Sequence, residues 1–202
     1  MRLNTVGRVA THMNAGPRLM SDRRIQRIKD IIIEKKGYKT GRFTLASGRP
    51  SNYYFNTKTV TLDPEGVSLI AEVILDKIRE LDATSIGGLV QGSIPIAVAV
   101  AHLSYERKEG KPIQAFWVRD AQKEHGDKTT YEGVLAPKSR VVIVDDVLTT
   151  GGSILKAIAE VERQGCQIVK IIVLLDREEG GGANLSEAGY SYESLLKASD
   201  FR

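Results

Sequence analysis

Residues 141–153 read VVIVDDVLTTGGS, and this stretch decides the fold class. Its first four residues are β-branched, which is typical of a strand buried on both faces of a parallel sheet. Two acids, Asp145 and Asp146, follow at the end of this run, and a turn rich in hydroxyls and glycines then leads into a helix. A buried strand, a turn and a helix in this order favour an α/β fold whose ligands bind at the carboxyl ends of the strands.

The turn that follows the acids has the chemistry of an anion-binding loop. Backbone N–H groups at the start of a helix point toward an anion, and glycines let the backbone approach it closely. Hydroxyl groups add further donors, at Thr149, Thr150 and Ser153. The loop is not a Walker motif, because no Gly-Lys-Ser/Thr sequence follows it.

The acid pair requires a partner other than phosphate alone. Two carboxylates would repel a ligand made only of phosphate groups, but they accept hydrogen bonds from vicinal hydroxyls such as those of ribose. They can also help to hold Mg²⁺ through bridging water. The alternative is a strand end at which Asp145 and Asp146 only cap the next turn, and this alternative explains the whole arrangement poorly.

The remainder of the chain alternates between strand and helix patterns around this segment. Continuous apolar runs predict strands over residues 85–90, 114–119, 140–144 and 168–175. Apolar residues at helical spacing predict helices over residues 21–36, 64–81, 94–105, 152–164 and 192–198. Short β-type runs over residues 42–45 and 53–55 flank a turn. We therefore expect a central, mainly parallel sheet flanked by helices.

One domain is expected over residues 21–202. Its core spans about residues 63–180, and a small helix-and-hairpin hood consists of about residues 21–62 together with the C-terminal segment. Residues 1–20 show no sustained periodicity, so we expect them to form a disordered extension.

Composition narrows the class of protein further. The 202 residues are 42% hydrophobic and carry 29 basic and 25 acidic side chains, a net charge of +4. The charges are mixed along the chain, which favours an ordinary solvated surface; affinity for an anionic small molecule or for nucleic acid is the alternative that composition leaves open. No apolar run approaches the length of a membrane span. The single cysteine, Cys166, excludes an internal disulfide and indicates a reducing, cytoplasmic setting.

The segment 141–153 resembles the phosphoribosyl-pyrophosphate (PRPP) signature of type I phosphoribosyltransferases. This resemblance implies the fold of that family, with the acids on the ribose hydroxyls and the loop on the 5-phosphate. It implies Mg²⁺ as a cofactor that PRPP carries into the site, with no metal ligand supplied directly by the chain. The PRPP-binding residues that it implies in this stretch are Asp145, Asp146, Val147, Leu148, Thr149, Thr150, Gly151, Gly152 and Ser153.

Other segments are similar to those of orotate phosphoribosyltransferases, over residues 43–49, 53–56, 88–95, 119–133 and 174–181. Residues 88–95, a glycine-rich turn between strand and helix, resemble the pyrophosphate loop of that family. The resemblance assigns orotate binding to Thr149, Arg177, Tyr54 and Phe55. A guanidinium fits a planar anionic base, and the two aromatic rings offer stacking faces. The alternative for either ring is a place in the core of the hairpin.

A long polar stretch over residues 119–133 is typical of a functional loop. The resemblance makes Arg119, Lys123 and His125 catalytic and PRPP-binding residues, on a loop that the two subunits of a homodimer share. Their cations would meet the departing pyrophosphate, and Lys123 or His125 can act as its general acid. Two positions where some members carry lysine hold Ala46 and Asp120, so fewer cations face the pyrophosphate.

The resemblance thus implies transfer of a phosphoribosyl group from PRPP to orotate, giving orotidine 5′-monophosphate and pyrophosphate. Two alternatives stay open. One is a regulator on the same fold that senses PRPP and binds nucleic acid, for which the chain lacks a clear basic appendage. The other is an enzyme acting on a purine or on uracil, against which the segment around Arg177 argues.

Overall fold

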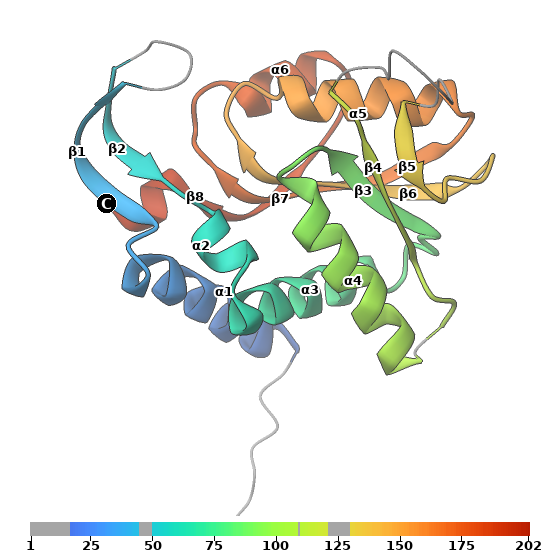
Figure 1. Cartoon of the computed structure of the whole chain (residues 1–202), viewed down its shortest axis with the longest axis horizontal. Coiled ribbons are helices and arrows are strands. Elements are labelled where there is room, and N and C mark those ends of the chain that lie inside the picture. The colour runs from blue at the N-terminus through green and yellow to red at the C-terminus, as the bar shows by residue number, and fades with distance from the viewer. Residues whose placement is uncertain (1–16, 45–49, 109, 121–129) are drawn as a thin grey trace, which may run out of the picture.

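The computed structural model describes residues 17–44, 50–108, 110–120 and 130–202, and its centre is a six-stranded sheet (Figure 1). The strand order is β5-β4-β3-β6-β7-β8. The strands are β3 (Ser85–Leu89), β4 (Gln114–Val118), β5 (Tyr131–Gly133), β6 (Arg140–Leu148), β7 (Gln167–Asp176) and β8 (Glu193–Lys197). Only β5 runs antiparallel to its neighbour, so the prediction of a mainly parallel sheet is confirmed.

Helices cover both faces of this sheet. In Figure 1, α5 and α6 lie above it and α1, α3 and α4 lie below it. The helices are α1 (Pro17–Glu34), α2 (Lys58–Thr61), α3 (Pro64–Ile78), α4 (Ser93–Arg107), α5 (Gly152–Arg163) and α6 (Gly181–Glu187). Alternate residues of β6 face opposite layers. Val142 and Val144 belong to the core between the sheet and helices α3 and α4, and Val141 and Ile143 belong to the core between the sheet and α5. This explains why the strand is apolar at every position.

The start of α3 is capped by a side chain. Asp63 is its N-cap, and Asp63 Oδ1 accepts a 2.9 Å hydrogen bond from the backbone N–H of Gly66. Pro64 occupies the first helical position, where a missing N–H costs nothing.

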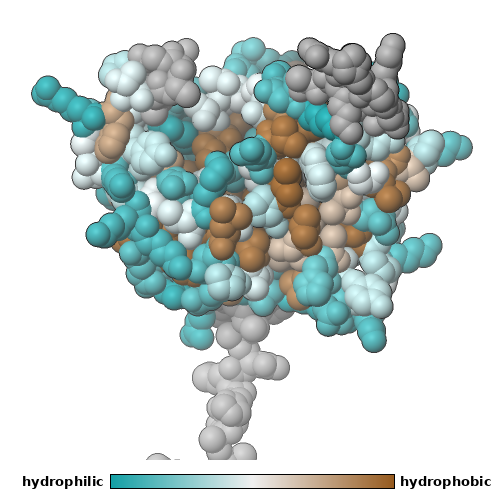
Figure 2. Space-filling view, viewed as in Figure 1, coloured by the Kyte–Doolittle hydropathy of each residue, from teal (hydrophilic) through white to brown (hydrophobic). Residues whose placement is uncertain are grey.

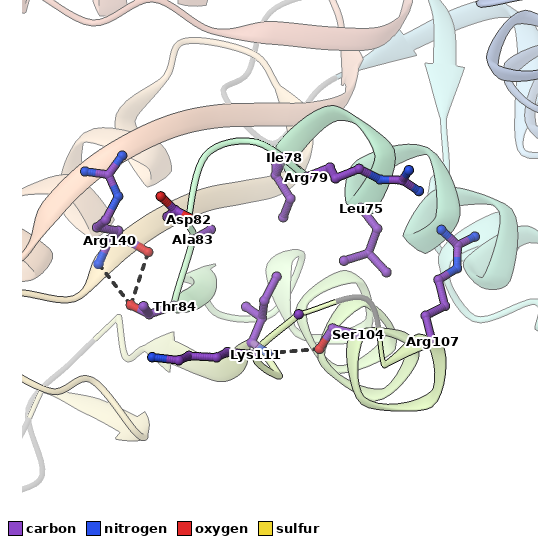
Figure 3. A pocket seen from close by; sticks show the side chains of 12 residues that line it. Leu75, Ile78, Arg79, Asp82, Ala83, Thr84, Ser104, Arg107, Lys111 and Arg140 are labelled. Carbon is purple, nitrogen blue, oxygen red and sulfur yellow. Dashed lines mark hydrogen bonds between the residues drawn. The ribbon is translucent and has the colours of Figure 1, made fainter. Parts of the chain in front are cut away.

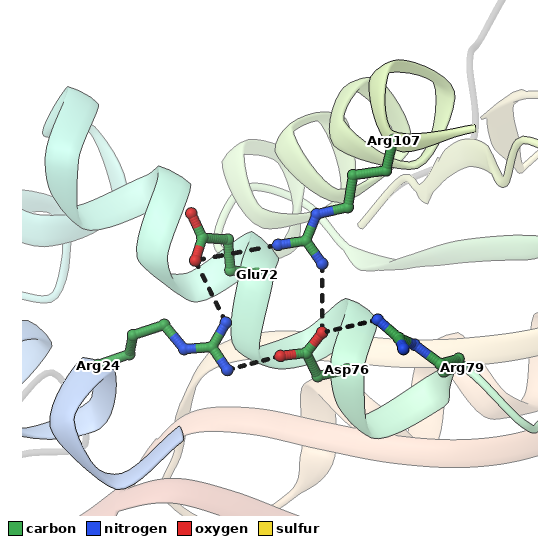
Figure 4. A network of polar contacts seen from close by, with 5 residues as sticks. All are labelled: Arg24, Glu72, Asp76, Arg79 and Arg107. Atoms are coloured by element: carbon green, nitrogen blue, oxygen red, sulfur yellow. Dashed lines mark hydrogen bonds and ion pairs between the residues drawn. The ribbon is translucent and has the colours of Figure 1, made fainter. Parts of the chain in front are cut away.

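An ion-pair network ties α1, α3 and α4 together (Figure 4). Glu72 and Asp76 of α3 bind Arg24 of α1 at 3.2 and 2.5 Å, and Arg107 of α4 binds Asp76 at 3.2 Å. Arg79 approaches Asp76 at 3.6 Å.

The hood contains the antiparallel hairpin of β1 (Tyr38–Thr44) and β2 (Pro50–Phe55). Aromatic rings join it to the end of the chain: Phe201 lies 5.3 Å from Tyr38 and 4.9 Å from Phe55, centre to centre. Phe201 belongs to η1 (Ala198–Phe201), a 3₁₀ turn that follows β8.

Several predicted elements differ from the structure. The final helix predicted over residues 192–198 is wrong, because this segment forms strand β8 beside β7. The first helix begins at Pro17, inside the stretch expected to be disordered. Strand β5 and the helices α2 and α6 were not predicted. None of the helices in the described ranges is long and apolar enough to cross a membrane.

Candidate active site

The acids Asp145 and Asp146 lie near the carboxyl end of β6, beside the turn that joins β3 to α4. Asp145 is 6% exposed, and its Oδ1 accepts a 2.9 Å hydrogen bond from the backbone N–H of Asp146. A Cβ atom on Gly92 would lie 2.1 Å from Asp146 Oδ1 and 2.7 Å from Asp145 Oδ1. Because Gly92 has no side chain, the turn packs directly against both carboxylates.

Burial raises the pKa of Asp145 to about 8, and the adjacent charge of Asp146 acts in the same direction. The positive charge of Lys58 opposes this shift. A buried carboxyl group beside a second one gains stability from a cation or from hydroxyl donors. The described residues contain no group of three or more His, Cys, Asp or Glu side chains that could hold a metal ion by themselves.

Thr57 reaches the acid pair from the hood. It precedes α2 and is 3% exposed, and its Oγ1 donates a 2.7 Å hydrogen bond to Asp146 Oδ2. Thr57 is not among the site residues predicted from the sequence. Its only signal in the sequence is that it directly follows the segment 53–56.

The turn into α5 provides an anion-binding cradle. Gly151 has a φ of +84°, in the left-handed region that favours glycine. No described side chain caps the start of α5, so the backbone N–H groups of its first turn are open to a ligand. The side chains of Thr150 and Ser153 are exposed at this turn, and that of Thr149 is half-buried.

Val147 and Leu148 extend β6 past its predicted end at residue 144. They lie opposite Leu175 and Asp176 of β7. The side chain of Leu148 is 1% exposed and belongs to the core, and its carbonyl oxygen accepts a 2.9 Å hydrogen bond from the backbone N–H of Arg177. Leu148 therefore supports the site through its packing and its main chain.

Arg177 follows β7 and lies close to the phosphate turn through this backbone contact. Its guanidinium is 2.7 Å from Glu179 Oε1 and sits 5.2 Å from the centre of the Tyr53 ring. The Tyr53 hydroxyl donates a 3.2 Å hydrogen bond to the Arg177 carbonyl oxygen. Tyr53 and Glu179 thus hold the arginine from two sides, and neither is among the site residues predicted from the sequence.

Comparison with known proteins identifies the family of this site. Residues 64–188, which contain the acid pair, the turn and Arg177, match the family model described as "Phosphoribosyl transferase domain". The orotate phosphoribosyltransferase of Rhodopseudomonas palustris strain BisB5 is 45% identical over 174 residues, which cover 84% of this chain and 92% of that protein. The enzyme of Aquifex aeolicus is 38% identical over 172 residues, covering 84% and 93%.

The chain belongs to the orotate phosphoribosyltransferase family.

Solved structures of the family have the same fold. The Mycobacterium tuberculosis orotate phosphoribosyltransferase in complex with PRPP matches with a TM-score of 0.70 and 29% identity, covering 88% of this chain and 97% of that one. The Aeropyrum pernix orotate phosphoribosyltransferase matches with a TM-score of 0.70 and 29% identity, covering 86% and 94%.

The two aromatic residues expected to face orotate in this family member lie in different places. Tyr54 is 41% exposed, and its ring packs 5.7 Å from that of Phe43. Phe55 is 7% exposed and packs between Tyr38 and Phe201. The expectation that Phe55 offers a stacking face is therefore corrected. The alternation of a strand turns adjacent rings to opposite faces, and Phe55 faces the core.

The expected catalytic cations of the orotate phosphoribosyltransferase family are described only in part. Arg119 follows β4, forms an ion pair with Glu132 of β5, and donates its backbone N–H to the Thr130 carbonyl oxygen at 2.8 Å. Asp120 binds Lys156 of α5 at 2.8 Å. Lys123, His125 and Ala46 lie outside the described residues.

Proposed function

We propose that the chain transfers the 5-phosphoribosyl group of PRPP to orotate and releases pyrophosphate. The observation that carries this proposal is that three groups meet at the carboxyl ends of β6 and β7. They are the acid pair, the uncapped start of α5, and Arg177 beside the phosphate turn. These groups match, in order, a ribose diol, a 5-phosphate and an anionic planar base.

The reaction breaks the anomeric C–O bond of PRPP and forms a C–N bond to orotate. Positive charge builds on the ribose, and Asp145 and Asp146 position its hydroxyls and stabilise that charge. Negative charge builds on the departing pyrophosphate, and Arg119, Lys123 and His125 stabilise it, with Lys123 or His125 as its general acid. Thr149 and Arg177 hold orotate in line with the broken bond, and the ring of Tyr54 offers it a stacking face.

Mg²⁺ enters this proposal as a cofactor carried by PRPP. The carboxylates of Asp145 and Asp146 fit such an ion, because they are adjacent hard oxygen donors, the first of them buried, and too few to form a complete coordination shell. When bound, the ion neutralises charge on the pyrophosphate. No residue of the chain would bind the ion directly; Asp145 and Asp146 would contact it through water, and PRPP would carry it.

A homodimer that shares the loop over residues 119–133 is part of the same proposal. Apolar surface supports it: Figure 2 shows hydrophobic residues gathering over the middle of one face, in the region of α2 and α4. Leu62, directly after α2, is 68% exposed, and Val98 of α4 is 49% exposed. A second copy of the chain would remove these side chains from water. The proposed compartment is the cytoplasm, and neither nucleic acid nor a membrane is a proposed partner.

The decisive assay follows orotate absorbance in the presence of PRPP and Mg²⁺, with uracil and hypoxanthine in parallel reactions. We expect consumption of orotate alone. Consumption of hypoxanthine or uracil instead would reassign the base, and no turnover with any base would favour a PRPP-binding regulator.

A further inference from the structure

A pocket of about 480 Å³ lies at the amino ends of the sheet strands, whereas the acid pair lies at their carboxyl ends (Figure 3). It opens where β3, β4 and β6 begin, since Thr84, Ile113 and Arg140 lie among its walls. Its volume falls in the range of small-molecule sites. None of its lining residues belongs to the active site described above.

The middle of this pocket is apolar. Leu75 and Ile78 point into it from α3, as Figure 3 shows, and Ala83 and Ile113 complete the apolar lining. An aliphatic floor of this kind suits a flat ring, which buries apolar area without requiring hydrogen bonds beneath it.

The two ends of the pocket are basic. Arg79 and Arg107 lie at one end and Lys111 and Arg140 at the other (Figure 3). Arg79 and Arg107 already contact Asp76 of the ion-pair network. The cations at the other end, Lys111 and Arg140, contact no member of that network.

Neither cation at that end has a carboxylate partner among the described residues. The Arg140 guanidinium donates to the Leu81 carbonyl oxygen at 3.1 Å and to Gln167 Oε1 at 3.0 Å, both neutral acceptors. Lys111 forms no hydrogen bond or ion pair within the described ranges. A phosphomonoester carries nearly two negative charges at neutral pH and offers several acceptor oxygens, so it matches the unpaired ammonium of Lys111 in a basic pocket.

Asp82 adds a second requirement for the ligand. It lines the same pocket and makes no hydrogen bond or ion pair with another described residue. A carboxylate beside a phosphate site disfavours a bare anion, but it accepts hydrogen bonds from hydroxyl or N–H groups. The ligand should therefore carry donors as well as a phosphate.

We propose that this pocket is a second ligand site that binds a nucleoside monophosphate, with its phosphate at Lys111, its sugar hydroxyls toward Asp82 and its base over Leu75 and Ile78. A nucleoside monophosphate is the compound class that combines a flat ring, hydroxyl donors and a phosphomonoester. The product of the proposed reaction belongs to the same class.

The test is calorimetric titration of the whole protein after PRPP and Mg²⁺ have saturated the active site, with no base present. The probe is uridine 5′-monophosphate, compared with uridine and with inorganic phosphate. We expect saturable binding of the nucleotide at one site per chain. We expect uridine and phosphate each to bind at least about tenfold more weakly, since each lacks part of the contact set.

Lys111→Glu reverses a charge at the rim and should weaken nucleotide binding at least about tenfold. Lys108→Glu is the matched control: it makes the same charge change on an exposed residue that does not line the pocket, and binding should stay within about twofold. Thermal unfolding of both variants checks that they are folded. The proposal is overturned if the nucleotide does not bind, if Lys111→Glu binds it as the unmodified protein does, or if phosphate alone binds as tightly.

Discussion

The Thr57 hydroxyl donates a 2.7 Å hydrogen bond to Asp146 Oδ2, although the two residues are 89 positions apart in the chain. The contact fixes the orientation of one carboxylate of the acid pair and holds the hood against the core. Thr57→Val keeps the shape of the side chain and removes the donor. We expect kcat/KM for PRPP to fall about tenfold, because a hydrogen bond to a charged group is lost.

Thr57→Ser is the control for this prediction, because it restores a hydroxyl at the same position. It should keep most of the activity that Thr57→Val loses. Equal activity in all three proteins would show that the contact does not position Asp146 for the reaction.

Gly92 is the second position where the site depends on close packing. A methyl group there would meet Asp146 Oδ1 at 2.1 Å, so Gly92→Ala must displace the acid pair or the turn. We expect a loss of at least about a hundredfold in kcat/KM. Gly66→Ala is the comparison, since its Cβ would meet Val60 Cγ2 at 2.5 Å in the core. Gly66→Ala should lower the melting temperature and leave the KM for PRPP unchanged. If Gly92→Ala instead keeps kcat/KM and loses only thermal stability, Gly92 does not belong to the site.

The raised pKa of Asp145 makes the stability of the ligand-free protein depend on pH. In the folded protein Asp145 keeps its proton up to about pH 8, whereas in the unfolded chain it loses the proton near the ordinary value of 3.8. Between these values the folded state binds more protons, so the free energy of unfolding falls as the pH rises, by at most about 1.4 kcal/mol per pH unit.

Asp145→Asn removes this titration and keeps an oxygen that can accept the Asp146 N–H. The melting temperature of the variant should therefore rise relative to that of the unmodified protein between about pH 5 and pH 8. Thermal unfolding at several pH values measures the difference. A constant difference across this window would show that Asp145 is ionised in the folded state throughout.

The sequence predicted the centre of the fold because its strands carry their own signal. β6 and β7 are buried on both faces, so their apolar runs are continuous. β8 has no such signal: its five residues can form a helix turn or a strand, and the pairing of Ile172 with Glu193 decides between them. That pairing is a tertiary contact, which local patterns do not contain.

The site also combines residues that are adjacent in the sequence with residues that only the fold brings together. The acid pair and the turn are contiguous, so their chemistry could be recognised in the sequence alone. Thr57 reaches Asp146 only through the fold, and the Tyr53 ring lies against Arg177 only because the hairpin closes over the end of β7. The burial of Phe55 also depends on Phe201, near the end of the chain. Such contacts follow from topology and not from spacing.

Arg177 should determine the affinity for orotate. Arg177→Ala removes the guanidinium that matches an anionic planar base, and we expect the KM for orotate to rise about tenfold or more, with a smaller change for PRPP. Arg202 provides a matched control, since its guanidinium also lies 5.2 Å from the centre of the Tyr53 ring. Arg202→Ala should change the orotate KM less than about twofold. If both variants behave alike, stacking on Tyr53 matters more than contact with the base.

The shared loop predicts that two inactive proteins can restore each other. If Lys123 of one subunit acts in the site that contains Arg177 of its partner, a mixture of Arg177→Ala and Lys123→Ala will form mixed dimers. In such a dimer one site receives both defects and the other receives none. Random exchange makes half of the dimers mixed, so about a quarter of the unmodified activity should return. Steady-state assays before and after subunit exchange measure this recovery. Activity that never exceeds the sum of the two separate variants would place the loop over the site of its own subunit.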